Sequence, residues 1–286
     1  MSDVVYLNGE FLPLDQARVS VLDRGFIFGD GVYEVIPVYS RHAFRLAEHL
    51  KRLQRSLDAI RLANPMTDAE WVQLIEEVIT RNPGEDQSVY LQVTRGAASR
   101  DHAFPKGARP TVFMMSGPLV TPGREAVENG VAAVSAIDNR WLRCDVKSVS
   151  LLPNCLLRQG AIEAGAEEAV LFRGGYLTEG SACNIFVVRN GTLLAPPKDH
   201  LVLAGITYDV VLELAARKNV PVEVREIPEA EARGADELWL TSSAKEVLAI
   251  TRLDGKPVGN GKPGAVFKIV HQAFQEFKRD VMRRAA

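Results

Sequence analysis

The chain of 286 residues is long enough to bury one large hydrophobic core or two smaller ones. Its composition, 47% hydrophobic and 24% charged with a formal net charge of -2, gives no reason to expect nucleic acid or an anionic membrane as a partner. The three cysteines, Cys144, Cys155 and Cys183, lack the paired spacing of a disulfide framework or a zinc site. Without a signal-peptide pattern or an apolar run of membrane-spanning length, we expect a cytoplasmic protein.

The first part of the chain predicts a small α/β domain. Strands are expected at residues 4–7 and 10–12, joined by a turn at Asn8-Gly9, and at 33–39, 89–94 and 111–115. Apolar residues at helical spacing predict an amphipathic helix over 45–62, with His49 and Arg52 off its apolar stripe. Thr67 and Glu70 form a capping-box pattern that starts a second helix. The glycines between residues 25 and 31 favour close backbone approach or a bulge.

Periodicity weakens between Gly117 and Gly130, so we expect domains at 1–117 and 131–286 with a linker at 118–130. The second domain alternates short elements. Strands are expected at 168–172, 184–188, 192–195, 222–227 and 237–241, with a further strand that carries Glu179 after the turn at Gly174-Gly175. Helices are expected at 154–164, after Gly205, and at 263–284, and a hairpin turn at Asp254-Gly255.

Two residues of this second part, Lys147 and Glu179, could together support one kind of chemistry. A lysine amine can condense with an aldehyde cofactor, and a carboxylate can keep a pyridine nitrogen protonated, which together suit pyridoxal 5'-phosphate (PLP). Taken singly, each residue is more simply a surface charge. The hypothesis therefore depends on the remaining motifs of the chain.

A phosphate-bearing cofactor also needs an anion site. The helix start at Gly205-Ile206-Thr207 offers unpaired backbone N–H groups and a hydroxyl, and Ser242 and Ser243 follow a strand with further donors. Arg52 offers a bidentate guanidinium. Each signal alone is weak, because serines often form turns and helix arginines are usually solvated. Only their convergence in space would make a phosphate site.

Other chemistries lack their motifs. The chain contains no Gly-x-Gly-x-x-Gly dinucleotide fingerprint, no Gly-x-x-x-x-Gly-Lys-Ser/Thr phosphate loop, no Gly-x-Ser-x-Gly elbow and no His-Glu-x-x-His metal motif. We therefore expect no metal at the site.

The motifs, in their order along the chain, resemble those of the class IV, fold type IV PLP-dependent aminotransferases, and within that family most of all the D-amino acid (D-alanine) transaminases. The stretches that carry the resemblance are Arg24-Gly25-Phe26-Ile27-Phe28-Gly29-Asp30-Gly31-Val32-Tyr33-Glu34, Glu48-His49-Leu50-Lys51-Arg52-Leu53, Cys144-Asp145-Val146-Lys147-Ser148, Thr178-Glu179-Gly180-Ser181, Gly205-Ile206-Thr207 and Thr241-Ser242-Ser243.

The resemblance implies an α/β fold of two domains, a small N-terminal one and a larger, β-rich C-terminal one, in a homodimer. It implies that Lys147 is the Schiff-base lysine and that Glu179 is the partner of the pyridine nitrogen. The implied phosphate and ring contacts are Arg52, Ile206, Thr207, Ser243 and Leu203.

In the D-amino acid branch, an arginine and a histidine on the loop after Thr-Arg-Gly, contributed by the partner subunit, join a tyrosine in binding the substrate carboxylate. By resemblance these are Arg100, His102 and Tyr33. A guanidinium fork and a second donor fit a carboxylate, which every α-amino acid carries. Two positions depart from the family pattern: Tyr208 stands where many relatives carry arginine, and Asp101 lies between Arg100 and His102.

We therefore expect a transaminase that moves the amino group of a D-amino acid, D-alanine first, to a 2-oxo acid such as 2-oxoglutarate in a ping-pong reaction. The alternatives within the family are an (R)-selective amine transaminase, a branched-chain L-amino acid transaminase and an aminodeoxychorismate lyase. A further alternative from another class is a non-catalytic scaffold, although such a relative would be expected to have lost Lys147.

Overall fold

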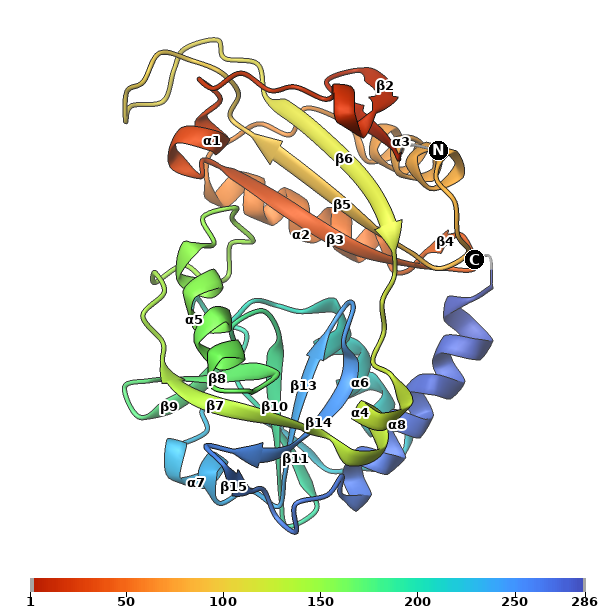
Figure 1. Cartoon of the computed structure of the whole chain (residues 1–286), viewed down its shortest axis with the longest axis vertical. Helices are drawn as coiled ribbons and strands as arrows, with labels where there is room; N and C mark the ends of the chain where they lie inside the picture. Colours follow the sequence, from red (N-terminus) through yellow and green to blue (C-terminus); the bar gives the residue numbers. More distant parts are fainter. Residues whose placement is uncertain (1–2, 285–286) are drawn as a thin grey trace. The chain divides into compact units, whose positions relative to one another are not determined.

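The computed structural model describes residues 3–284 and divides into two compact units (Figure 1). Of the described residues, the first unit contains 3–119, the segment Val146–Leu151 and 282–284. The second unit contains Val120–Asp145 and Leu152–Val281. Lys147 therefore belongs to the first unit, although it is surrounded in sequence by residues of the second, and Glu179 belongs to the second.

The first unit is built on a six-stranded antiparallel sheet with the order β2-β1-β6-β5-β3-β4. Its strands are β1 Val4–Leu7, β2 Glu10–Pro13, β3 Gly31–Tyr39, β4 His42–Ala43, β5 Gln87–Thr94 and β6 Thr111–Pro118. The hairpin between β1 and β2 turns at Asn8 and Gly9, with φ of 50° and 105°, as the Asn-Gly pair predicts.

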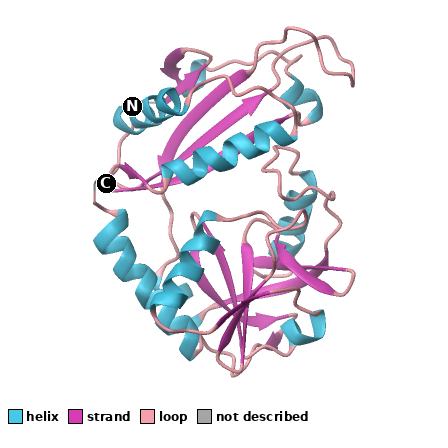
Figure 2. Ribbon diagram, turned by 180° about the vertical axis from the view of Figure 1, so that it is seen from behind, coloured by secondary structure: helices cyan, strands magenta, loops and turns pink. Residues whose placement is uncertain are grey.

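Helices α2 (Leu46–Ala59) and α3 (Asp68–Arg81) cover one face of this sheet, as Figures 1 and 2 show. The capping box predicted at Thr67 and Glu70 is confirmed, with the Thr67 N–H donating to Glu70 Oε2 at 2.7 Å and the Glu70 N–H donating to Thr67 Oγ1 at 3.3 Å. Leucine side chains of α2, Trp71 and Ile75 of α3, and the inward residues of β3 and β5 form one fully buried core. Burial of each such side chain contributes about 1.5–3 kcal/mol.

A short helix that the sequence did not suggest, α1 (Arg24–Phe28), lies just before β3. The Asp23 carboxylate accepts the N–H of Gly25 at 2.8 Å and starts the helix, and Gly29 ends it with a φ of 66°. A Cβ atom at Gly25 would lie 2.3 Å from Cγ2 of Thr94, so glycine is required for α1 to lie this close to the sheet.

The second unit contains a nine-stranded mixed sheet, in which eight strands follow the order β12-β11-β10-β13-β14-β7-β8-β9 and the ninth, β15, pairs with β14. Its strands are β7 Val131–Ile137, β8 Glu168–Arg173, β9 Tyr176–Gly180, β10 Asn184–Arg189, β11 Thr192–Ala195, β12 Val222–Val224, β13 Glu237–Ser242, β14 Glu246–Leu253 and β15 Lys256–Pro257. Its helices are α4 Arg124–Asn129, α5 Leu152–Glu163, α6 Ile206–Arg217, α7 Glu229–Arg233 and α8 Ala265–Phe277.

Some predicted boundaries in this unit were wrong. The strand expected at 222–227 ends at Val224, and the helix expected to reach residue 284 ends as an α-helix at Phe277, followed by a π-helical turn, Lys278–Met282. Helix α4 lies in a stretch that the sequence suggested to be irregular. Short elements of this kind are set by tertiary packing more than by local periodicity.

Candidate active site

Lys147 is fixed to the beginning of strand β3. The Tyr33 N–H donates to the Lys147 carbonyl at 3.0 Å, and the Val149 N–H donates to the Gly31 carbonyl at 3.0 Å. The Lys147 N–H in turn donates to Oγ of Ser56, on α2, at 3.2 Å. The Lys147 amine lies 4.2 Å from the centre of the Tyr33 ring. Backbone bonds on both sides of the lysine therefore hold its amine over an aromatic face.

The arginine predicted as a phosphate ligand, Arg52, is buried rather than solvated. Its Nε and Nη2 donate to the two carboxylate oxygens of Glu34 at 2.8 and 2.7 Å. His49 Nδ1 lies 2.8 Å from Oε2 of the same carboxylate. His49 and Arg52, although they lie off the apolar stripe of their helix, are both buried, and Glu34 on the inner face of β3 balances the charge of Arg52.

The electrostatics of this cluster follow from its burial. Burial alone would raise the pKa of Glu34, but the attraction and hydrogen bonds of Arg52 outweigh it and hold the pKa well below its usual range. Burial lowers the pKa of His49, so its imidazole is neutral, and its Nε2 has no hydrogen-bond partner among the described residues. We did not find Glu34 or His49 as site residues from the sequence, because strand and helix positions of this kind are usually apolar.

Glu179, on β9, accepts several hydrogen bonds inside the second unit. Its Oε1 accepts Nη1 of Arg140, and its Oε2 accepts the Leu203 N–H at 3.1 Å and Nδ2 of Asn184 at 3.3 Å. Burial raises the pKa of Glu179 to about 7, and the attraction and hydrogen bonds of Arg140 and the Leu203 N–H offset part of that rise. This carboxyl can therefore gain or lose a proton near neutral pH.

Arg140 links Glu179 to a second buried carboxylate, Asp138. Nε and Nη2 of Arg140 each donate to Asp138 at 2.9 Å, and the Thr178 hydroxyl donates to it at 2.9 Å. Burial opposes ionisation of Asp138, but the bonds from Arg140 outweigh it and lower the pKa to about 2. Arg140 and Asp138 were not predicted as site residues from the sequence. The only available signal was an Asp-x-Arg pair just after a strand.

The helix start predicted as a phosphate cradle is present at the N-terminus of α6. Gly205 is the N-cap, and no side chain caps the helix. Ile206 and Thr207 begin the helix and are buried. A Cβ atom at Gly205 would lie 2.1 Å from Oδ1 of Asn184, whose Nδ2 donates to the Leu203 carbonyl at 2.9 Å. Asn184 thus joins the Glu179 carboxylate to the helix start.

The other predicted cofactor ligands lie at the turn after β13. Oγ of Ser242 accepts the Lys245 N–H at 3.0 Å, and Ser243 is half-buried in the same turn. Just before them, Oγ1 of Thr241 is buried and has no hydrogen-bond partner among residues 3–284. An unpartnered buried hydroxyl is uncommon, and an anionic ligand with oxygen acceptors would satisfy it.

The predicted substrate residues fall in two places within the first unit. Arg100 and His102 lie together on the exposed loop between β5 and β6, with the Arg100 guanidinium 5.5 Å and the His102 ring 5.4 Å from the centre of the Phe28 ring. Tyr33 lies on β3 beside Lys147. Of the two departures, Asp101 accepts the Ala103 N–H at 3.2 Å, and Tyr208 is buried, with its hydroxyl donating to the Pro196 carbonyl at 2.9 Å.

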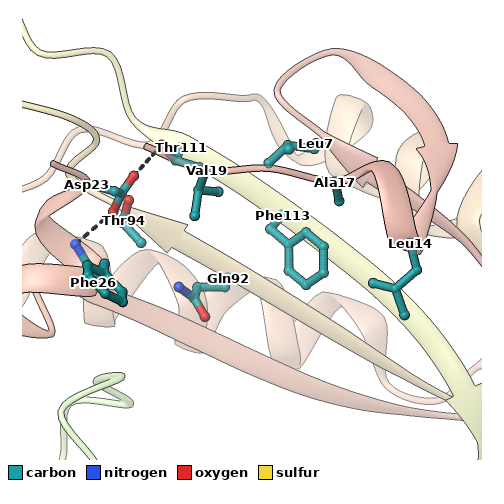
Figure 3. Close-up of a pocket in the computed structure, with 11 residues that line it drawn as sticks. Leu7, Leu14, Ala17, Val19, Asp23, Phe26, Gln92, Thr94, Thr111 and Phe113 are labelled. Atoms are coloured by element: carbon teal, nitrogen blue, oxygen red, sulfur yellow. Dashed lines mark hydrogen bonds between the residues drawn. The ribbon is translucent and has the colours of Figure 1, made fainter. Parts of the chain in front are cut away.

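A cavity of about 350 Å³ lies elsewhere in the first unit, near α1, and Figure 3 shows its lining. Apolar side chains such as Leu14, Val19, Phe26 and Phe113 surround it, and its polar rim includes Asp23, whose Oδ2 accepts the Thr111 hydroxyl at 2.6 Å. None of the residues predicted for the site is among those that line it.

The donor set described above fits PLP. An amine is available for its aldehyde, a buried carboxyl of raised pKa for its pyridine nitrogen, and an uncapped helix start for its phosphate. Among residues 3–284, no group of three or more His, Cys, Asp or Glu side chains could hold a metal ion, and no helix is long and apolar enough to cross a membrane.

Comparison with known proteins identifies the family. The family model described as "Amino-transferase class IV" matches residues 31–253. The D-alanine aminotransferase of Bacillus licheniformis is 40% identical over 271 residues, covering 95% of each chain. That of Staphylococcus epidermidis is 35% identical over 273 residues, covering 96% of this chain and 97% of the other.

The solved structures that resemble this chain include a branched-chain amino acid aminotransferase from T.th. with pyridoxamine 5'-phosphate. Its TM-score is 0.90 at 28% identity, with coverage of 99% of this chain and 96% of that chain. The expected fold type and family are confirmed, and so is PLP as the cofactor. The chain therefore belongs to the class IV aminotransferases, fold type IV enzymes that depend on PLP.

Proposed function

We propose that the protein is a D-amino acid aminotransferase that transfers the amino group of a D-amino acid, D-alanine first, to a 2-oxo acid such as 2-oxoglutarate. The observation that carries the proposal is the pair Arg100 and His102, two side chains of one loop that both lie against the ring of Phe28. The resemblance of nearly the whole chain to two D-alanine aminotransferases supports it.

In the proposed reaction, PLP supplies an electron sink that stabilises negative charge at the substrate α carbon. The Lys147 amine would hold the cofactor aldehyde and, once the amino group of the substrate has displaced it, would move the proton between the α carbon and the cofactor. Glu179 would hold the proton of the pyridine nitrogen, and Arg140 keeps that carboxylate in place. The first half-reaction would release its 2-oxo acid product before the second substrate binds.

The phosphate of the cofactor would lie at the N-terminus of α6, held by the backbone of Ile206 and Thr207, with Ser242 and Ser243 as further donors. Arg52 would add a guanidinium whose orientation Glu34 fixes through two hydrogen bonds. Leu203 would pack against the cofactor ring.

The substrate carboxylate would be bound by Arg100 and His102, together with a Tyr33 hydroxyl. A guanidinium binds a carboxylate through two parallel hydrogen bonds, so a substrate without a carboxylate leaves these donors unpaired. This reasoning favours an amino acid over a simple (R)-amine. We assign Asp101 and Tyr208 no direct contact with the substrate, because the side chain of Asp101 accepts the Ala103 N–H and Tyr208 is buried with its hydroxyl bonded to the Pro196 carbonyl.

We further propose a homodimer in which this loop reaches the site of the partner subunit. Four exposed apolar side chains between residues 19 and 26 support a subunit contact: Val19, Val21, Leu22 and Phe26 are 54%, 72%, 48% and 73% exposed. Val19 and Phe26 also line the cavity of Figure 3. Three free cysteines agree with a reducing, cytoplasmic location.

The alternative within the family is a branched-chain L-amino acid aminotransferase, which the structural similarity to the solved branched-chain enzyme keeps open. Steady-state kinetics with 2-oxoglutarate and D-alanine, L-leucine or (R)-1-phenylethylamine would decide between them. We expect the largest kcat/KM for D-alanine. Turnover of L-leucine or the amine with no turnover of D-alanine would contradict the proposal.

The role of Lys147 has a separate test. Borohydride reduction of the PLP-loaded protein followed by peptide mapping should label Lys147, and the Lys147→Ala variant should lose both the yellow colour and the transaminase activity. Label on another lysine, or full activity in the variant, would show that the assignment of the catalytic amine is wrong.

A further inference from the structure

Arg24 connects the buried start of helix α1 to the loop that carries Arg100 and His102. Its side chain is 4% exposed, and its Nε donates to Oδ2 of Asp30 at 2.7 Å. The rest of the guanidinium donates to backbone carbonyls of three consecutive loop residues: Nη1 to Asp101 and Ala103, and Nη2 to His102. One side chain thus holds the backbone of the loop on both sides of His102.

Phe28, four residues further along α1, supports the same loop through its ring. The guanidinium of Arg24 lies 4.8 Å from the ring centre, on the same side of the helix. The Arg100 guanidinium and the His102 ring lie 5.5 and 5.4 Å from it. Both side chains that the proposed function assigns to the substrate carboxylate therefore contact the surface that Arg24 and Phe28 make together.

The position of α1 is itself fixed by the sheet. Asp23 caps the helix at Gly25 and accepts the Thr111 hydroxyl on β6, two bonds drawn in Figure 3. Asp30 receives a second arginine, Arg95, whose Nε and Nη2 donate to it at 2.8 and 3.0 Å. Arg24 is thus held by Asp30 and by a helix that is bonded to the sheet. The loop that it contacts is exposed and has no regular secondary structure around Arg100.

We propose that Arg24 is a positioning residue for substrate binding, which orders the loop so that Arg100 and His102 face the substrate carboxylate. This inference rests on the proposed function, because it takes the role of those two side chains from it. A guanidinium is required because one planar group must donate to several carbonyls and also pair with Asp30; a lysine amine cannot match that geometry. An irregular loop loses conformational freedom only where such bonds hold it.

The test compares Arg24→Met and Arg24→Lys with the wild-type holoenzyme. We expect Arg24→Met to raise KM for both D-alanine and 2-oxoglutarate about tenfold, with a much smaller change in kcat and no change in the visible absorbance of bound PLP. Arg24→Lys should restore only part of the loss. Arg41→Met is a matched control, because Arg41 also donates to main-chain carbonyls, those of Ile79 and Gly84, away from this loop.

A double-mutant cycle separates positioning from a general loss of structure. If Arg24 acts through Arg100, Arg24→Met should raise KM far less in an Arg100→Leu background than in the wild type. Equal effects in both backgrounds, or a KM for Arg24→Met within about twofold of the wild type, would overturn the inference. Should Arg24→Met fail to fold, Phe28→Leu removes the shared ring and should show the same dependence on Arg100.

A failure of the proposed function can be distinguished from a failure of the inference about Arg24. If Arg100→Leu leaves KM for D-alanine unchanged, the assignment of the carboxylate site is wrong, whatever Arg24 does. Amide hydrogen exchange in residues 98–104 then still reports on the loop: faster exchange in Arg24→Met supports its ordering by Arg24, and unchanged exchange overturns it.

Discussion

Replacement of Glu34 by glutamine tests whether the buried cluster on β3 and α2 holds Arg52 in place. Glu34 is 1% exposed and accepts two hydrogen bonds from Arg52 and one contact from His49. Glutamine has nearly the same shape but no charge, so Glu34→Gln deprives the Arg52 guanidinium of this carboxylate while adding no steric clash. Removal of one partner from a buried ion pair destabilises a protein by about 3–5 kcal/mol.

We therefore expect the free energy of unfolding of Glu34→Gln, measured by urea denaturation at pH 7, to fall by about 3–5 kcal/mol relative to the wild type. Because the pKa of Glu34 in the folded protein lies below its ordinary value of 4.5, its stabilisation is present above that pH and is lost as the pH falls further. The difference in free energy of unfolding between the two proteins should change little between about pH 5 and pH 8 and should become smaller below about pH 4.5.

The double variant Glu34→Gln/Arg52→Met should recover most of this loss, since it removes the buried charge together with its partner. The control is Glu77→Gln, which breaks the exposed pair with Arg81 on α3 and should cost at most about 1 kcal/mol. Wild-type stability in Glu34→Gln, or a double variant much less stable than the single one, would refute the reasoning about Arg52.

Three further predictions concern the second unit. Gly205→Ala should lower PLP affinity measured by absorbance titration, because its added Cβ would displace Asn184 beside the helix start; unchanged affinity would speak against a phosphate there. Because burial raises the pKa of Glu179 to about 7, the folded cofactor-free protein binds more protons than the unfolded chain between about pH 4.5 and 7. Relative to Glu179→Gln, the wild type should therefore lose about 3 kcal/mol of stability as the pH rises through that range. The same pH dependence of stability in both proteins would contradict this prediction. Tyr208→Phe should keep its activity and lose about 1 kcal/mol of thermal stability, because it removes only the hydrogen bond to the Pro196 carbonyl; a large loss of kcat would assign Tyr208 to the site.

Local signals in the sequence predicted most of the regular elements. The capping box at Thr67 and the turn at Asn8-Gly9 depend on residues within a few positions of one another, so they could be recognised directly. Helix α1 could not, because it has five residues and depends on a cap from Asp23 and on the close approach of Gly25 to Thr94. The π-helical end of the last helix likewise left no mark in its periodicity.

The candidate site divides in the same way. Lys147 and Glu179 could be chosen from their chemistry and from the resemblance to a family, and their roles remain predictions. The buried ion pairs of Arg52 and Glu179 could not be predicted, because Glu34 and Arg52 lie on different elements, and Arg140 is 39 positions from Glu179 in the sequence. A pattern in the chain shows which groups are present, whereas the charge of a buried group depends on neighbours that only the fold brings together.

Because the segment Val146–Leu151 belongs to the first unit, no single cut of the polypeptide yields both units intact. Cleavage anywhere between residues 120 and 145 would leave the lysine-bearing segment on the C-terminal fragment, while the strand edge that receives it stays on the N-terminal one. A gene fragment ending near Leu119 would encode the sheet of the first unit without Lys147, whose carbonyl accepts the Tyr33 N–H. Split versions of this enzyme should therefore regain function only when both pieces reassemble.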